Sequence, residues 1–202
     1  LHLIRTQRPG LQAAPSDWND WAMRVLKAHG RFQLLCALRA GPCGVSGLNQ
    51  RIESLLQRHQ LIEPNGTWYA GRPVIVTRND YALGLMNGDM GITLPVPQRH
   101  RDTGELTWTL RVAFPTHDDA APIHWVLPSR LTSADTVYAL TVHKSQGSEW
   151  QHVMLALPSE PTPVLTRELI YTGLTRARQR LTLWAPNLAT LREGCAKQVQ
   201  RS

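Results

Sequence analysis

The sequence predicts an α/β domain built on a parallel sheet and interrupted by a small antiparallel β-barrel. An apolar run over residues 32–38 is typical of a strand buried on both faces of a parallel sheet, and a helical pattern follows it over 45–59. From about residue 67, turn signals recur at short intervals between short strands, which is typical of a small barrel. After Pro128, buried strands and helices alternate again.

The other α/β elements follow from caps and periodicity. Ser16 and Asp17 offer N-cap oxygens to a helix over 16–29, and Gly30 ends it. Towards the C-terminus we expect a strand at 152–157, a helix at 166–178 with Thr166 as N-cap, a strand at 180–184 and a helix at 187–198.

The chain has 202 residues, enough for one sizeable domain or two small ones. We expect one α/β domain over residues 1–68 and 131–202, with the β insertion over 70–130. Lys and Arg number 22 against 15 Asp and Glu, a net charge of +7. Arginine dominates this excess and its planar guanidinium suits phosphate, so a nucleic-acid or nucleotide partner is favoured. A high-GC genome explains the arginine-to-lysine ratio equally well, but not the net charge.

The cysteines favour a reducing compartment. There are three, Cys36, Cys43 and Cys195, without a Cys-x-x-Cys pair. We therefore expect neither a disulfide framework nor a zinc site, and a cytoplasmic location. No segment reaches the roughly 18 apolar residues that a membrane span needs, so no membrane partner is expected.

Two strings carry the strongest functional signal. Residues 141–149 read Thr-Val-His-Lys-Ser-Gln-Gly-Ser-Glu, and residues 171–178 read Tyr-Thr-Gly-Leu-Thr-Arg-Ala-Arg. They resemble motifs V and VI of superfamily 1 DNA helicases in order, in spacing and in the apolar strand between them. An ordinary polar turn explains the first string if it stands alone, but the pair favours a helicase.

Two further passages narrow the resemblance. Residues 33–42 with 47–49 resemble motif IV of the RecD family, and residues 71–80 with 87–89 resemble the start of its SH3-like insertion. Nearly the whole chain thus resembles the C-terminal part of RecD, the α chain of exodeoxyribonuclease V. The resemblance implies a RecA-like helicase domain with an inserted SH3-like barrel. It also implies a 5′→3′ ATP-driven DNA translocase that works with RecB and RecC in double-strand break repair and recombination.

The resemblance assigns nucleotide-binding roles to four residues. Arg176 matches the arginine finger that neutralises charge on the γ-phosphoryl oxygens of ATP, although a plain cation near a helix C-terminus is the alternative. Glu149 matches a carboxylate near the nucleotide ribose, and Gly147 permits close backbone approach. Arg39 follows the first buried strand, where a phosphate or DNA contact and a plain surface arginine are equally good interpretations.

The resemblance also assigns DNA contacts in motif V. Thr141 and His143 match positions that contact the DNA backbone and bases, and Lys144 adds a cationic phosphate contact. Arg178 and Arg180 are expected to be ordinary cations near a helix C-terminus.

In the insertion, Arg72, Arg78 and Asn79 are expected to contact DNA near the aromatic residues Trp68 and Tyr81. The alternative is that the aromatic residues of the insertion build the barrel core. We favour that alternative for its tryptophans.

The chain contains no Gly-x-x-x-x-Gly-Lys-Ser/Thr phosphate loop and no acidic pair after a hydrophobic strand. We therefore expect ATP with Mg²⁺ to be held mainly by an N-terminal part outside this sequence. The chain, which begins at Leu1, is expected to be a fragment that is inactive alone. No metal site is expected within it.

Two other classes stay open. One is a protein-docking module of a RecBCD-like complex that has lost motor function, and the other is the helicase part of a conjugative relaxase. The retained set of Thr141, His143, Glu149 and Arg176 argues against lost motor function, because a docking module does not need it.

Overall fold

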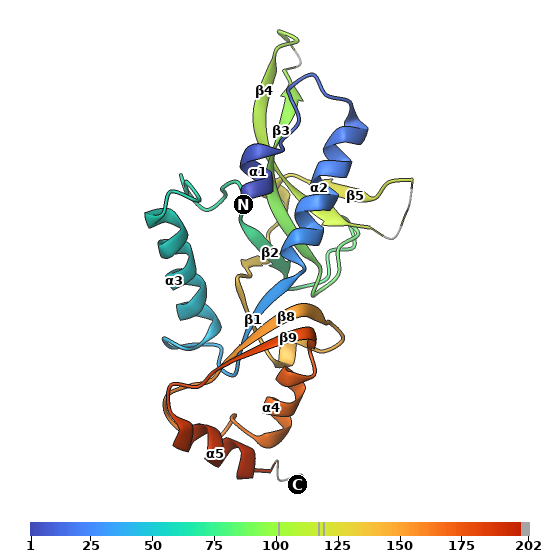
Figure 1. Ribbon diagram of the computed structural model, residues 1–202. Helices are drawn as coiled ribbons and strands as arrows, with labels where there is room; N and C mark the ends of the chain where they lie inside the picture. The colour runs from blue at the N-terminus through green and yellow to red at the C-terminus, as the bar shows by residue number, and fades with distance from the viewer. Residues whose placement is uncertain (101, 117, 119, 199–202) are drawn as a thin grey trace. The chain divides into compact units, whose positions relative to one another are not determined.

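The computed structural model describes residues 1–100, 102–116, 118 and 120–198. It divides the chain into two compact units, each built around its own sheet (Figure 1). The β unit comprises Leu1–His29 and Leu55–Val137, and the α/β unit comprises Gly30–Ser54 and Tyr138–Ser202. This division differs from the expected boundaries, because residues 1–29, 55–68 and 131–137 group with the β strands.

The α/β unit contains a four-stranded sheet in which every neighbouring pair is parallel. This confirms the predicted parallel sheet. The sequence pattern missed β7, since three residues are too few to show periodicity. In sheet order the strands are β7 (Ala139–Thr141), β1 (Phe32–Cys36), β8 (Trp150–Ala156) and β9 (Ala177–Trp184). The helical elements are η2 (His143–Ser145), α4 (Arg167–Leu174), α5 (Leu188–Ala196) and α3 (Val45–Arg58), whose last turn from Leu55 groups with the β unit.

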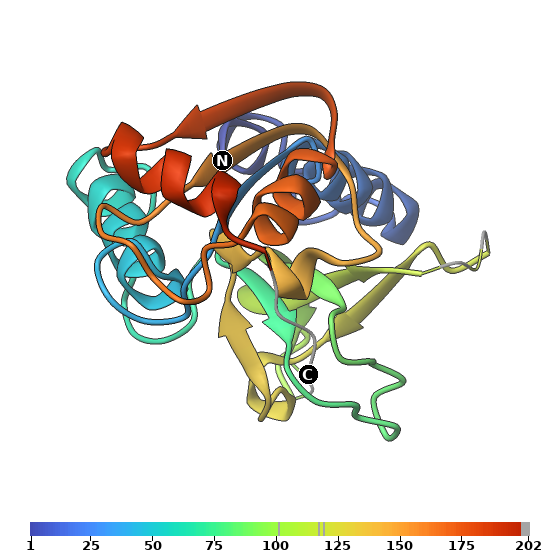
Figure 2. The ribbon, with the colours of Figure 1, turned by 90° about the horizontal axis from the view of Figure 1, so that it is seen from below.

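Helices cover both faces of this sheet. On one face, Leu34 and Ala156 pack against the partly buried Leu48 and Ile52 of α3. Leu155 points to the other face, because neighbouring strand residues alternate. There Gly173 of α4 lies so close that an added Cβ would be 3.0 Å from a Leu155 methyl carbon. The two C-terminal helices, α4 and α5, lie side by side (Figure 2).

The helix predicted over 166–178 begins where expected but is too long. Thr166 is the N-cap, and its hydroxyl accepts a hydrogen bond from the amide of Leu169. The helix ends at Leu174 because the next residues pair with β8 instead of continuing the helix. The amide of Trp150 donates to the carbonyl of Arg176 at 2.9 Å, and β9 then begins. Arg176 therefore lies in a turn, and Arg178 is a strand residue rather than a helix-terminal cation.

The β unit contains an antiparallel sheet of five strands. The barrel closure that the sequence suggested is not confirmed, because strand pairing runs from β5 at one edge of the sheet to β6 at the other. In sheet order the strands are β5 (Ile123–Val126), β4 (Leu106–Pro115), β3 (Met90–Arg99), β2 (Pro73–Val76) and β6 (Ala134–Thr136). The short helical elements are α1 (His2–Thr6) and η1 (Pro128–Arg130).

The remaining helix, α2 (Pro15–His29), confirms the prediction over 16–29. Its start differs from the expected cap. Proline occupies the first helical position, and the Asp17 carboxylate accepts from the amide of Ala14 at 3.1 Å. Asp17 thus satisfies the backbone from inside the first turn instead of standing before it.

The core of the β unit includes helix α2 as well as the strands. Trp18 and Trp21 of α2 belong to a buried cluster with sheet residues such as Leu94. The tryptophans expected to build the barrel core differ in burial: Trp108 is 41% exposed, whereas Trp68 and Trp125 pack against buried clusters of the unit. The expected core role is therefore wrong for Trp108. Tyr81, for which no core role was favoured, is 78% exposed.

Among the helices that the structure describes, none combines the length and apolar character that crossing a membrane requires.

Candidate functional site

Arg176 lies in the turn between α4 and β9, where three hydrogen bonds hold its half-buried guanidinium. Its Nε donates to the carbonyl of Thr172 at 3.2 Å, and Nη1 donates to the carbonyl of Ser148 at 3.3 Å. Nη2 reaches the hydroxyl of Thr175 at 3.4 Å. The bond to Ser148 joins the motif VI turn to the end of the motif V segment. The two strings that share a helicase signature are thus in direct contact.

Glu149 lies next to this contact and carries the opposite charge. Its Oε2 accepts a hydrogen bond from Nε of Arg178 at 2.9 Å, and both side chains are substantially exposed. We call Ser148, Glu149, Arg176 and Arg178 the turn cluster. It gathers two guanidinium groups and one carboxylate beside the start of β8 and β9.

The motif V segment continues from β7 to β8 without an α-helix. Thr141 is 4% exposed, and its hydroxyl accepts from the amide of Lys144 at 3.2 Å. This bond supports the η2 turn and leaves His143 and Lys144 exposed. Gly147 has a φ of +82°, which favours glycine, and allows the chain to turn towards β8. Thr141 therefore positions the turn, and its burial argues against direct contact with DNA.

His143 and Gln146 also line a pocket of about 770 Å³ in the α/β unit. On its other side lie Thr172 and Glu168 of α4 and Lys197 from the end of α5. The pocket thus offers neutral hydrogen-bonding groups and charges of both signs. It gives His143 a recessed surface beside the exposed motif V turn.

Residues 136–184, which contain both motifs, match the family described as UvrD-like helicase C-terminal domain. The whole chain is 36% identical over 201 residues to the RecBCD enzyme subunit RecD of Mycobacterium tuberculosis (strain ATCC 25618 / H37Rv), of which it covers 31%. It is 36% identical over 184 residues to the RecBCD enzyme subunit RecD of Haemophilus influenzae, with 90% of this chain and 26% of that protein covered. The chain belongs to the RecD family of superfamily 1 helicases.

The match to the RecD family extends to another named helicase. The chain is 32% identical over 160 residues to the ATP-dependent RecD2 DNA helicase of Deinococcus radiodurans, covering 78% of this chain and 20% of that protein. The chain spans less than a third of the length of the three relatives named here. These comparisons confirm the predicted family and the helicase C-terminal fold.

Arg39 lies apart from the turn cluster. It is exposed and follows the C-terminal end of β1, where Cys36 pairs with Ala156 at the end of β8. Glu149 precedes the opposite end of β8, and Arg176 precedes β9 at that same end. The structure therefore does not bring Arg39 together with the other expected nucleotide-binding residues of this RecD-family chain.

Arg72, an expected DNA contact, is enclosed within the β unit. It is only 7% exposed, its Nε donates to the hydroxyl of Thr136 at 2.9 Å, and its guanidinium lies 4.4 Å from the ring centre of Trp68. The hydrogen bond joins the residue that precedes β2 to Thr136 of β6. A basic residue close to an aromatic one in the sequence is compatible with a buried pair and with a binding surface. The sequence alone therefore does not distinguish the two.

Arg78 and Asn79, in contrast, lie on an exposed loop after β2. The Asn79 amide donates to the Tyr81 hydroxyl at 3.2 Å, and its Oδ1 accepts from the amide of Asn87 at 2.8 Å. These bonds order the loop while the Arg78 side chain and the Tyr81 ring stay exposed. The expected DNA role of Arg78 and Asn79 is geometrically accessible.

Sequence reasoning missed the second guanidinium of the turn cluster. Arg178 was interpreted as a helix-terminal cation, although its place two residues after Arg176 becomes informative once β9 is known to begin at Ala177. The carbonyl of Ser148 was also missed, because backbone groups leave no signal in side-chain identity.

The described residues contain no group of three or more His, Cys, Asp or Glu side chains that could hold a metal ion. All three cysteines are free. Burial in the sheet raises the pKa of the Cys36 thiol to about 12. Cys36 is therefore a buried, protonated core residue rather than a metal ligand or nucleophile.

Proposed function

We propose that this chain is the arginine-finger half of an ATP-dependent DNA helicase motor. The observation that carries the proposal is the contact between motifs V and VI, in which Arg176 donates to the carbonyl of Ser148 beside Glu149. In this proposal the longer protein moves 5′→3′ on single-stranded DNA and acts in double-strand break repair and recombination.

The hydrogen bonds of Arg176 suit an arginine finger. Their acceptors are two backbone carbonyls and one hydroxyl, all neutral, at distances between 3.2 and 3.4 Å. A phosphate oxygen carries negative charge and forms shorter, stronger bonds to guanidinium. An arriving γ-phosphoryl group therefore competes well for the Nη atoms, while the bond from Nε to Thr172 keeps the side chain oriented.

Glu149 and Gly147 complete the nucleotide-facing part of the proposal. Arg178 holds one carboxylate oxygen of Glu149, and the other carboxylate oxygen is a suitable acceptor for a ribose hydroxyl. Gly147 supplies the turn that places Glu149 before β8. Arg39 is left out of this set because it lies at the opposite end of the sheet.

The proposed DNA contacts are His143 and Lys144 of motif V, with Arg78 and Asn79 of the insertion. All four lie in exposed segments, and imidazole, ammonium, guanidinium and amide groups all bind phosphate or base edges. Thr141 acts indirectly by supporting the turn that carries His143 and Lys144.

The cofactor in this proposal is ATP with Mg²⁺. The described residues supply a guanidinium and a carboxylate for the phosphates and ribose, but no metal-binding cluster. A phosphate loop and a Mg²⁺-binding carboxylate from another part of the motor are therefore required. Because its relatives include RecBCD enzyme subunits, we further propose subunits of the RecB and RecC type as protein partners.

The decisive experiment compares Arg176→Ala with the natural sequence in the longer helicase that we propose contains this chain. We expect ATP turnover to fall by roughly 10³–10⁵, because the finger stabilises charge only in the transition state. The affinity for single-stranded DNA, measured in parallel, is expected to stay unchanged. The isolated chain should hydrolyse no ATP.

A matched control is Arg180→Gln, which removes an exposed arginine further along β9. It should retain near-normal turnover. Unchanged turnover in Arg176→Ala, or clear ATP hydrolysis by the isolated chain, would contradict the proposed motor. Unchanged turnover would favour a protein-docking module instead.

A further inference from the structure

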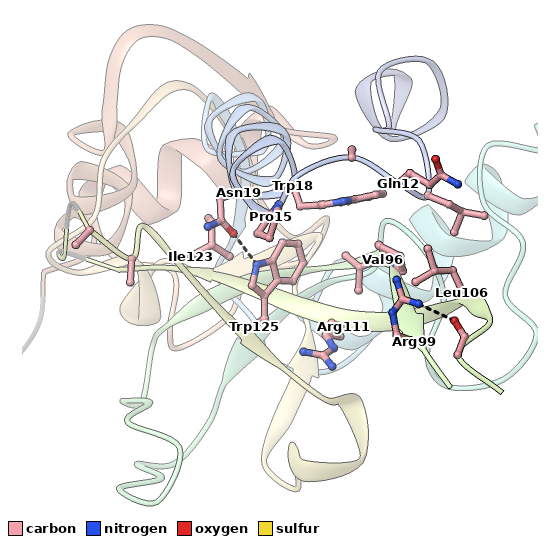
Figure 3. A pocket seen from close by; sticks show the side chains of 16 residues that line it. Gln12, Pro15, Trp18, Asn19, Val96, Arg99, Leu106, Arg111, Ile123 and Trp125 are labelled. Atoms are coloured by element: carbon pink, nitrogen blue, oxygen red, sulfur yellow. Dashed lines mark hydrogen bonds between the residues drawn. The ribbon is translucent and has the colours of Figure 1, made fainter. Parts of the chain in front are cut away.

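The β unit contains a pocket of about 970 Å³ between helix α2 and the strands of the antiparallel sheet (Figure 3). Pockets that bind ligands have volumes of about 300–1,000 Å³. The indole of Trp18 forms one wall, and Val96 and Trp125 face it from the strands. None of the residues proposed above for nucleotide or DNA binding lines this pocket, so it is a separate feature of the fold.

Two buried donors in the pocket lining have no hydrogen-bond partner. They are Nε1 of Trp18, a side chain only 5% exposed, and Nε of Arg111. The neighbouring Trp125 shows the usual arrangement, since its Nε1 donates to Oδ1 of Asn19 at 2.8 Å. An unpaired buried N–H is unfavourable, so each of the two donors requires an acceptor from water or from a ligand.

The charge of the lining is also unmatched. Arg99 and Arg111 contribute two guanidinium groups, and the described lining residues include no aspartate or glutamate. Arg99 donates through Nη1 to the carbonyl of Gly104 at 2.9 Å, and no ion pair of Arg99 occurs among the described residues. Guanidinium groups bind carboxylates in two-pronged, charge-assisted contacts. The missing acceptors are therefore best supplied by acidic groups.

The rest of the lining favours a protein ligand over a nucleic acid. Most other lining side chains are aliphatic, among them Val96, Leu106 and Ile123. Bases bind single-strand sites by stacking on open aromatic faces, whereas most of this lining is aliphatic. An aliphatic or aromatic side chain of a peptide fits such walls, with its backbone carbonyls and nearby carboxylates reaching the donors.

We propose that this pocket binds a short segment of a partner protein in which an apolar anchor side chain is flanked by aspartate or glutamate. The anchor enters between α2 and the strands, and the flanking acids pair with Arg99 and Arg111. One acceptor of the segment pairs with Nε1 of Trp18. This site is independent of the ATP and DNA contacts proposed above.

The test uses the ¹⁵N-labelled chain and follows its seven tryptophan indole N–H signals by NMR. Trp18→Phe identifies the Trp18 signal. The probes are capped hexapeptides with a central Leu-Leu, Leu-Phe or Ile-Phe pair between Glu-Asp and Asp-Glu. We expect a saturable downfield shift of the Trp18 signal. Binding should weaken by about tenfold or more when the acids are replaced by Gln and Asn, or the central pair by alanines.

Arg111→Gln should weaken the acidic peptides by about tenfold or more, whereas Arg130→Gln, an exposed arginine of the same unit outside the pocket, should not. Arg99→Gln gives the same test if Arg111→Gln does not fold, and the peptide controls need no variant. The proposal is overturned if no peptide shifts the Trp18 signal at millimolar concentration or if the amide controls bind equally well. It is also overturned if a ten-residue oligothymidylate shifts this signal at lower concentration than the peptides.

Discussion

The two units of the chain differ in how many of their buried polar atoms have a hydrogen-bond partner. Of the six buried side-chain polar atoms without a hydrogen-bond partner among the described residues, one lies in the α/β unit, on Gln33. The other five lie in the β unit, on Trp18, Arg72, Thr93, Arg111 and His124. The turn cluster of the α/β unit, in contrast, holds Arg176 by three local hydrogen bonds.

The Arg176 guanidinium is already held by hydrogen bonds, whereas the buried donors of the β unit have no acceptor. A preorganised group loses little conformational freedom when its ligand arrives, which suits a residue that must act in a transition state. A buried donor without an acceptor lowers stability until water or a ligand satisfies it. In the α/β unit this fits the proposed role of Arg176 in catalysis, and in the β unit it fits the proposed peptide site.

The strongest way to break the organised side of this comparison is Leu155→Ala. Leu155 is fully buried in β8 and packs against Gly173 of α4, the helix that leads to Arg176. Deleting its methyl groups removes apolar burial and leaves a cavity, so the free energy of unfolding should fall by about 2–5 kcal/mol. Urea denaturation of the chain measures this change.

Leu183→Ala is the matched control for that substitution. Leu183 pairs with Leu155 across β8 and β9 but is 39% exposed, so its truncation should cost clearly less. Equal losses for the two variants would mean that the contact between α4 and β8 does not set the stability of the turn cluster.

The second prediction concerns how the buried Cys36 thiol of the parallel sheet makes the stability of the chain depend on pH. Burial raises the pKa of Cys36 from its ordinary value of 9.0 to about 12. The folded state therefore favours the protonated thiol, and this contribution is fully present below pH 9. It is lost as pH rises from 9 towards 12, on the order of 1.4 kcal/mol per pH unit.

Urea denaturation at several pH values between 8 and 10.5 tests this, with Cys36→Ala as the reference. The stability advantage of the natural chain over the variant should shrink above pH 9, because alanine has no proton to lose. Stability differences that stay constant over this range would show that the thiolate is accommodated in the fold.

The sequence predicted the parallel sheet well because its central strands are long apolar runs. Residues 32–38 and 152–157 contain β1 and most of β8, and Thr166 identified the start of α4. The family was also found correctly, because motifs V and VI are contiguous strings. Each of these features depends on residues that are adjacent in the chain, so a single sequence is enough to predict it.

The errors arose where tertiary contacts override local pattern. The helical period continued past Leu174, but pairing between Trp150 and Ala177 drew the chain into a strand. Arg72 looked like a surface cation, although Thr136 and Trp68 enclose it in the fold. The domain boundaries, the barrel and the functional roles of the site residues stay predictions.

The third prediction tests the start of the helix that ends beside Arg176. Thr166 accepts the Leu169 amide through its hydroxyl, so Thr166→Ala should lower the free energy of unfolding by about 1 kcal/mol, and Thr166→Ser should restore most of it. Asn187→Ala removes the equivalent cap of α5 and should cost a similar amount. In the longer helicase, only the Thr166 change should lower ATP turnover, since α5 does not lead to the turn cluster.

The smallest effect is expected for Arg178→Gln. The pair between Arg178 and Glu149 is short but exposed, and such pairs contribute only about 0.2–1 kcal/mol. The loss should disappear in high salt, because exposed charges are screened. Arg180→Gln, which removes an arginine of the same strand, should change stability even less, since no ion pair of Arg180 is found in the described part of the chain.

Arg178→Gln also tests whether the position of the Arg176 guanidinium is independent of the ion pair. If Arg176 is held by Ser148 and Thr172 alone, its guanidinium signal in NMR spectra should shift little when Arg178 is replaced. A large shift, or a loss of several kcal/mol, would mean that the turn cluster depends on its ion pair. The organised side of the comparison would then depend on screened surface charge rather than on backbone hydrogen bonds.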